Sequence, residues 1–248
     1  MAGHSHAANI ARRKGAQDIR RGKVFTKISR EIIVAAKGGA DINFNAKLFT
    51  VVTKARKAGM SKDTIDAAIA KGSGTGASEA YEAVRYEGYG PGGAAILIDG
   101  LTDNRNRTAS DLRSIFTKNG GTMGESGSVG FMFERVGLIE YPAEKILEEA
   151  MLEAAIEAGA DNCELQGDTH QITTSMENLN AVREQLAKKF GEPPVAKLTF
   201  LAKITTASSG DNASALMDLV EALEDNDDVQ EVFTNAEFDA ATLEKLSA

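Results

Sequence analysis

The chain has 248 residues, of which 42% are hydrophobic and 26% are charged, a composition typical of a globular protein with two or three domains. No apolar run approaches the roughly 18 residues of a membrane span, and the N-terminus lacks the hydrophobic stretch of a signal peptide. The single cysteine, Cys163, excludes an internal disulfide and a four-thiolate zinc site. We therefore expect a cytoplasmic protein that does not contact membranes.

The net charge of −8 is distributed unevenly along the chain. Residues 1–76 hold 15 Lys and Arg against 5 Asp and Glu, a net charge of +10, whereas the remainder carries −18. The first thirty residues contain a single acid, Asp18, among eight basic side chains and several small or hydrogen-bonding residues. This pattern predicts an arm that contacts the phosphates of a polyanion, and the alternative is a solvated tail.

Three short helices are predicted in this basic region. Residues 23–37 place Ile28 and Ile32 on an apolar face and three basic residues on another: Lys23, Lys27 and Arg30. Asn45 is expected to cap the second helix, and Ser61 begins the third. The glycine-rich residues 72–76 (GSGTG) predict a domain boundary, so residues 1–76 form a predicted basic helical domain.

Beyond the linker, apolar runs of strand length alternate with helical patterns of 10–17 residues. The predicted strands cover residues 94–101, 129–139, 163–175 (a strand or hairpin), 195–206 and 229–233. The predicted helices cover residues 108–119, 142–159, 175–191 and 211–224. This order predicts two small α+β units, one inserted into the other because the last helix and strand can complete the first sheet. The predicted domains are residues 77–140 with 204–248, and residues 141–203.

The polar segment 102–108 (TDNRNRT) follows a predicted buried strand, where loops commonly carry function. Arg105 and Arg107 would point the same way on an extended backbone and could contact phosphate. The alternative is a capped loop in which Asp103 pairs with an arginine.

Other motifs favour structural roles. The glycine-rich segment 88–93 precedes a strand, which predicts a tight turn rather than a phosphate cradle. Residues 224–228 (EDNDD) lack the glycine and closing glutamate of a calcium loop, so they predict a polar helix end and turn. No nucleophile stands beside a base in a recognisable motif, so we expect no catalytic residue, cofactor, metal or small-molecule substrate. Loss of Met1 would leave an N-terminal Ala-Gly-His, whose amine, amides and imidazole suit Cu(II) or Ni(II) in vitro. The alternative is that the amine and His4 simply belong to the nucleic-acid arm.

Several motifs are similar to those of the YebC/PmpR family, whose mitochondrial relatives include the translational activator of cytochrome c oxidase. They are MAGHS at 1–5, RYEGYGPGG at 85–93, TDNRNRT at 102–108, FMFER at 131–135 and EALEDN at 221–226. The resemblance implies a basic three-helix N-terminal domain followed by two ferredoxin-like α+β domains, the second inserted into the first. It also implies a non-enzymatic role, either in DNA-binding transcriptional regulation or in translation on the ribosome. Members usually read Lys-Trp after MAGHS, whereas His6 and Ala7 stand here, so one aromatic that could stack on a base is absent.

We therefore expect a nucleic-acid-binding regulator that contacts structured ribosomal RNA to assist translation. Glycine-broken basic arms suit irregular RNA, no predicted helix resembles a base-reading recognition helix, and the acidic body would be repelled from a long duplex. The alternatives are a DNA-binding transcriptional regulator and a protein-interaction adaptor. The expected nucleic-acid-binding residues are Arg12, Arg13, Lys14, Arg20, Arg21, Lys23, Lys27, Arg30, Lys54, Lys57, Arg105 and Arg107.

Overall fold

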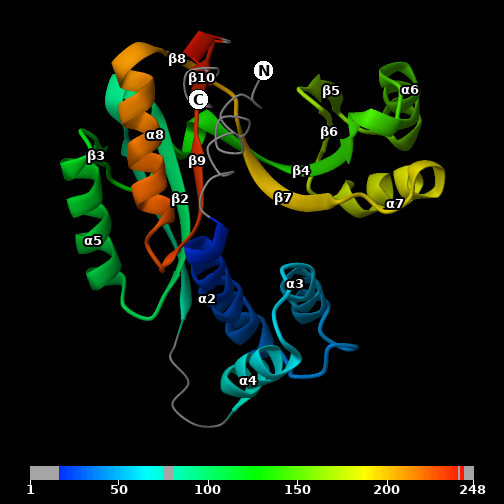
Figure 1. The fold of residues 1–248 in the computed structure, drawn as a ribbon, viewed down its shortest axis with the longest axis horizontal. Coiled ribbons are helices and arrows are strands. Elements are labelled where there is room, and N and C mark those ends of the chain that lie inside the picture. The colour runs from blue at the N-terminus through cyan, green and yellow to red at the C-terminus, as the bar shows by residue number, and fades with distance from the viewer. Residues whose placement is uncertain (1–16, 75–80, 240, 243–248) are drawn as a thin grey trace. The chain divides into compact units, whose positions relative to one another are not determined.

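The computed structural model describes residues 17–74, 81–239 and 241–242 (Figure 1). These residues group into two compact units, which lie within residues 12–129 plus 209–232 and within residues 130–208 plus 233–248. No helix in the described ranges is both long enough and apolar enough to cross a membrane.

The first unit begins with three helices, α2 (Gln17–Ala36), α3 (Ala46–Lys57) and α4 (Lys62–Ser73). The predicted caps of the second and third helices are confirmed. The Asn45 side chain accepts a hydrogen bond from the Leu48 N–H at 3.0 Å, and the Ser61 hydroxyl accepts one from the Thr64 N–H at 3.3 Å. The first helix starts six residues before its predicted start, because the single Gly22 inside it weakens the helix without ending it.

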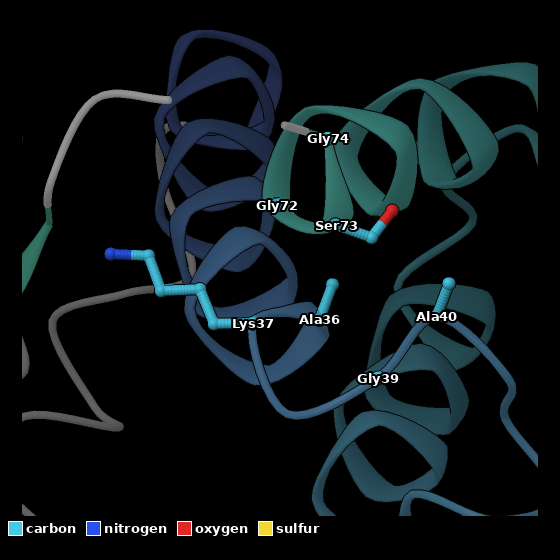
Figure 2. A pocket seen from close by; sticks show the side chains of 7 residues that line it. All are labelled: Ala36, Lys37, Gly39, Ala40, Gly72, Ser73 and Gly74. Atoms are coloured by element: carbon cyan, nitrogen blue, oxygen red, sulfur yellow. The ribbon is translucent and has the colours of Figure 1, made fainter. Parts of the chain in front are cut away.

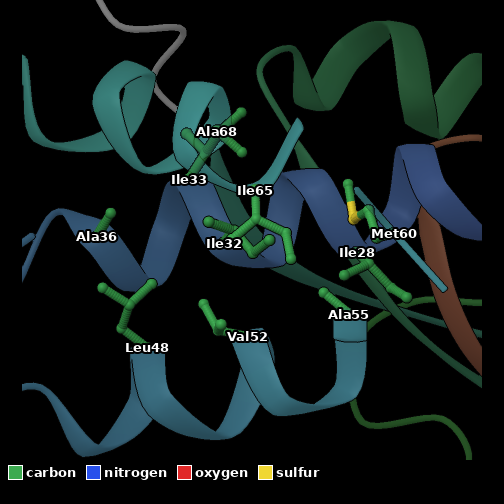
Figure 3. Packing of buried hydrophobic residues seen from close by; sticks show 10 residues of the cluster. All are labelled: Ile28, Ile32, Ile33, Ala36, Leu48, Val52, Ala55, Met60, Ile65 and Ala68. Atoms are coloured by element: carbon green, nitrogen blue, oxygen red, sulfur yellow. The ribbon is translucent and has the colours of Figure 1, made fainter. Parts of the chain in front are cut away.

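One apolar face of each helix meets the others in a common core (Figure 3). The buried residues are Ile28, Ile32, Ile33 and Ala36 of α2, Leu48, Val52 and Ala55 of α3, Met60, and Ile65 and Ala68 of α4. Close approach of α2 and α4 requires a glycine at position 72, since a Cβ there would lie 2.3 Å from the Ile33 carbonyl oxygen. The apolar positions predicted from the helical spacing thus form the core of the three helices.

A four-stranded sheet completes the first unit, in the order β3 (Thr122–Met123), β1 (Glu82–Tyr89), β2 (Ala95–Thr102) and β9 (Val229–Thr234). β1 and β2 form an antiparallel hairpin through η2 (Pro91–Gly93), where Gly92 and Gly93 have φ values of 75° and 78°. The glycine-rich segment is therefore a turn, as predicted. Helices α5 (Arg105–Lys118) and α8 (Gly210–Glu224) lie side by side against this sheet (Figure 1).

The second unit contains a sheet in the order β5 (Asn162–Gln166), β6 (Thr169–Thr174), β4 (Phe133–Pro142) and β7 (Val195–Ala202). Helices α6 (Glu148–Ala158) and α7 (Leu179–Phe190) share a core with it that includes Ile139, Met151 and Leu186. The chain order strand–helix–strand–strand–helix–strand is that of a ferredoxin-like unit. The unit also holds η3 (Gly130–Met132), η4 (Ala143–Lys145) and the parallel pair β8 (Thr206–Ser208) and β10 (Ala236–Phe238).

The predicted fold class, a basic helical region followed by two α+β domains, is confirmed. The helix predicted over residues 142–159 is interrupted, because Ile146 and Leu147 are extended between η4 and α6. Nε2 of the buried His170 lies 2.8 Å from the Ile146 carbonyl oxygen, which therefore bonds outside the helix. The domain boundaries remain a prediction, and the one proposed between residues 140 and 141 falls inside β4.

Candidate nucleic-acid interface

Three of the predicted phosphate-binding residues share one face of α2, at the spacing i, i+4, i+7. We call this set the α2 basic face: Lys23, Lys27 and Arg30. An acidic segment of the same unit, residues 224–228 between α8 and β9, meets this face. Lys23 Nζ lies 3.0 Å from Asp225 Oδ1, and Lys27 Nζ donates to the Glu224 carbonyl oxygen at 2.7 Å. The polar turn predicted at the end of α8 is therefore also a binding partner for basic side chains.

Asp228 is the centre of this contact. Its side chain is only 6% exposed, and its Oδ1 lies 2.8 Å from Nη1 of Arg30, which is itself 14% exposed. Its Oδ2 accepts hydrogen bonds from Arg107 Nη2 at 3.1 Å and from the Thr108 hydroxyl at 2.7 Å. Arg30 also donates to the Asp227 carbonyl oxygen. One buried carboxylate thus joins α2, α5 and the segment before β9.

The charges around Asp228 determine its ionisation. Burial raises the pKa of its carboxyl group, but hydrogen bonds from Thr108 and Arg107 and the positive charges of Arg30 and Arg107 outweigh burial. The pKa therefore lies below its ordinary value. The carboxylate is therefore held in its charged form, and its hydrogen bonds and ion pairs compensate for the burial of that charge.

The polar segment after β2 is helical rather than extended. Asn104 caps α5 by accepting a hydrogen bond from the Arg107 N–H at 3.1 Å, so both arginines lie in the first helical turn. Arg105 Nε pairs with Glu82 at 2.6 Å, and Arg107 Nη2 pairs with Asp103 at 2.6 Å. The arrangement in which Asp103 pairs with an arginine is therefore the one observed. The Arg105 side chain remains 61% exposed despite its ion pair.

The basic residues of α3 have a different environment. This helix contains no acidic residue. Lys54 Nζ pairs with Glu31 at 2.7 Å. Three other cations on the helix are exposed, and their side chains make no ion pair or hydrogen bond within the described part of the chain. We call this set the α3 cations: Lys47, Arg56 and Lys57. Only Lys57 of this set was among the residues predicted from the sequence.

Two exposed aromatic side chains at the start of α3 are not among the residues predicted from the sequence. Phe44 is 91% exposed and Phe49 is 56% exposed. They stand on either side of the cap residue Asn45, a spacing that the sequence already displays. An aromatic residue normally indicates a core position, so their exposure could only be learned from the structure.

The remaining predicted residues lie wholly or partly outside the described ranges. Arg12, Arg13 and Lys14, and the Ala-Gly-His segment, lie outside the described residues. Arg20 and Arg21 fall within α2, but their side chains lie outside the described part. No group of three or more His, Cys, Asp or Glu that could hold a metal ion occurs among the residues the structure describes.

A pocket lies between the C-terminal ends of α2 and α4 (Figure 2). It is lined by Ala36, Lys37, Gly39, Ala40, Gly72, Ser73 and Gly74. The Lys37 side chain points away from Ser73, and its Nζ donates to the Tyr81 carbonyl oxygen at 3.1 Å. The Ser73 hydroxyl donates to the Ile69 carbonyl oxygen at 2.9 Å. Both polar side chains of the lining are already paired, so we assign no ligand to this pocket.

Comparison with known proteins identifies relatives over nearly the whole chain. The model described as "TACO1/YebC protein N-terminal domain" matches residues 5–75, and "TACO1/YebC second and third domain", which carries a transcriptional-regulator label, matches residues 81–236. The crystal structure of a conserved hypothetical protein from Aquifex aeolicus is 43% identical, with a TM-score of 0.82, and the match covers 92% of this chain and 94% of that one. Proteins of this kind are generally nucleic-acid binders that resemble transcription regulators. The chain therefore belongs to the TACO1/YebC family.

Proposed function

We propose that this protein is a non-enzymatic regulator of gene expression in the cytoplasm that binds nucleic acid mainly through phosphate contacts of its N-terminal domain. The observation that carries the proposal is the set of α3 cations, Lys47, Arg56 and Lys57. They are exposed on a helix without acids, and their side chains have no partner in the described ranges. Such cations gain most from a phosphate backbone, because binding releases its condensed counterions without breaking an internal ion pair.

In this proposal the main role of the α2 basic face is to stabilise the fold. A phosphate that drew Arg30 away would leave the buried Asp228 without one of its two charged partners. Breaking a buried pair in this way is costly. Lys23, whose side chain is 37% exposed, can exchange the 59% exposed Asp225 for a phosphate at little cost, since ion pairs near the surface contribute little. We therefore assign the main phosphate contacts to the α3 cations, and we keep Arg12, Arg13 and Lys14 as further predicted contacts.

We further propose that the target is structured RNA on the ribosome. α3 offers Lys and Arg, which contact phosphate as well as guanine, but it contains neither Asn nor Gln, the usual readers of adenine in the major groove of DNA. The exposed Phe44 and Phe49 instead suit unpaired bases, which are common in structured RNA and absent from an intact duplex. The net charge of −18 on residues 77–248 would also disfavour a long duplex.

Two other functions each rest on a specific observation. DNA-binding transcriptional regulation is favoured by the label of the matching family model, and the same cations would bind any duplex nonspecifically. A protein-interaction adaptor is favoured by α6, where Leu152 and Ile156, one turn apart, are 44% and 68% exposed.

Cosedimentation with ribosomes, set against DNA footprinting at physiological salt, tests the proposal. We expect the full chain to sediment with ribosomes. A variant with Lys47, Arg56 and Lys57 changed to Gln should bind less, and a control with Leu152 and Ile156 changed to Ala should bind as well as the wild type. A protected, sequence-specific DNA site without ribosome binding would favour the transcriptional alternative. Loss of binding only in the control variant would favour the adaptor.

A further inference from the structure

We propose that Phe44 and Phe49 form a stacking platform for unpaired nucleobases, placed beside the α3 cations. The inference rests on the proposed nucleic-acid binding and specifies which part of the nucleic acid this surface recognises. It assigns the bases to the two rings and the phosphates to the neighbouring lysine and arginine side chains.

The two rings lie outside the core of the three helices. Phe44 is 91% exposed and Phe49 is 56% exposed, whereas the three-helix core beneath them is filled by aliphatic side chains and Met60. Exposing two phenylalanines forgoes the free energy that burial would provide, of the order of 2 kcal/mol per ring. Neighbouring exposed apolar side chains of this kind commonly mark a binding surface.

Phe44 and Phe49 stand on either side of the cap of α3. With Asn45 as the cap of α3, Phe44 is the residue before the cap and Phe49 is the fourth helical residue. Apolar side chains at these two positions often pack on each other as a hydrophobic staple. Here Phe44 is almost fully exposed, so the staple is not closed. Two rings from the same helical end are therefore available to a flat partner.

The helix that carries Phe49 also carries exposed positive charges. Phe49 and Arg56 are seven residues apart and share a face of α3, with Thr53 between them, and Lys47 and Lys57 are also exposed. Proteins that bind single strands combine aromatic rings for successive bases with cations that follow the backbone. The same combination does not suit a second copy of this surface, because a symmetric contact would bring the same cations together.

Binding to RNA of two shapes tests this inference. The probes are a labelled oligouridylate of roughly 12 nucleotides and a blunt RNA duplex of similar length. Phe44→Leu with Phe49→Leu keeps apolar side chains but removes both rings. We expect at least about tenfold weaker binding to the single strand and little change on the duplex. Phe131→Leu, at a 60% exposed position in the other unit, is the matched control and should leave both affinities unchanged.

A fluorescence measurement reports stacking itself. The chain contains no tryptophan, so Phe49→Trp introduces a single indole whose emission a stacked base should quench. Saturable quenching by the oligouridylate, with none for Phe131→Trp, supports the platform. Wild-type affinity in the double Leu variant, or unquenched emission while RNA is bound, overturns the platform and leaves the proposed function intact. A wild-type protein that binds neither RNA overturns the proposed function. A change in the sedimentation of the double Leu variant without RNA, relative to the wild type, would indicate that a second copy of the chain occupies this surface. That result would also overturn the platform.

Discussion

Two basic helices of the N-terminal region, α2 and α3, differ in what surrounds their charges. The α2 basic face meets the acidic segment 224–228, and Arg30 reaches the buried Asp228. The side chains of the α3 cations, Lys47, Arg56 and Lys57, have no such partner in the described ranges. Basic residues that look alike in the sequence therefore have different roles. The α2 basic face stabilises the fold, whereas the α3 cations remain open to a polyanion.

The largest expected effect is on the α2 side of this comparison. Asp228→Ala removes the acceptor of Arg30, Arg107 and Thr108, leaving buried polar groups without a partner. We expect a loss of about 3–5 kcal/mol in the free energy of unfolding, measured by urea denaturation. Asp225→Ala is the control, because its exposed pair with Lys23 should contribute less than about 1 kcal/mol. Equal losses in both variants would contradict a buried centre at Asp228.

A smaller effect is expected from pH. The folded-state pKa of Asp228 lies below its unfolded value of about 3.9, so the unfolded chain binds the proton first as the pH falls. The stability contributed by this carboxylate is complete above that unfolded value and is lost as the pH falls through the folded pKa. Asp228→Asn should therefore lose less free energy of unfolding than the wild type between pH 5 and pH 2. Parallel pH profiles would show that Asp228 does not titrate in this way.

The smallest effect is expected at the exposed end of the α2 basic face. Lys23→Gln removes one exposed pair with Asp225 and should change the free energy of unfolding by less than about 1 kcal/mol. Arg30→Gln, two turns further along α2 at the residue that pairs with Asp228, should cost clearly more in the same urea experiment, because its partner is buried. Equal stabilities of the two variants would contradict the expectation that Arg30 contributes more to the free energy of unfolding than Lys23.

Much of the fold follows from local sequence signals. Asn45 and Ser61 start helices because their side chains accept backbone N–H groups, and this chemistry can be read directly from the sequence. The alternation of strand and helix patterns predicted both α+β domains. The break at Ile146 could not be foreseen, because it depends on a hydrogen bond to His170, 24 residues away.

The candidate site was less predictable, for the same physical reason. Lys27 and its partner Glu224 are 197 residues apart, so no local pattern shows that the charge is already used. The sequence allows an extended backbone at Arg105 and Arg107, but Asn104 caps a helix there. The exposure of Phe44 depends on which residues fill the three-helix core, which periodicity along one helix does not determine.

The salt dependence of nucleic-acid binding tests the central claim most directly. For the full chain on a duplex, about five phosphate contacts predict a log–log slope near −4.5. Changing Lys47, Arg56 and Lys57 to Gln should flatten the slope by about 2.7, whereas changing Lys23 and Lys27 to Gln should flatten it by less than about 1.8. A flat wild-type series would contradict phosphate binding, and a slope that changes only in the α2 variant would contradict the division between the two helices.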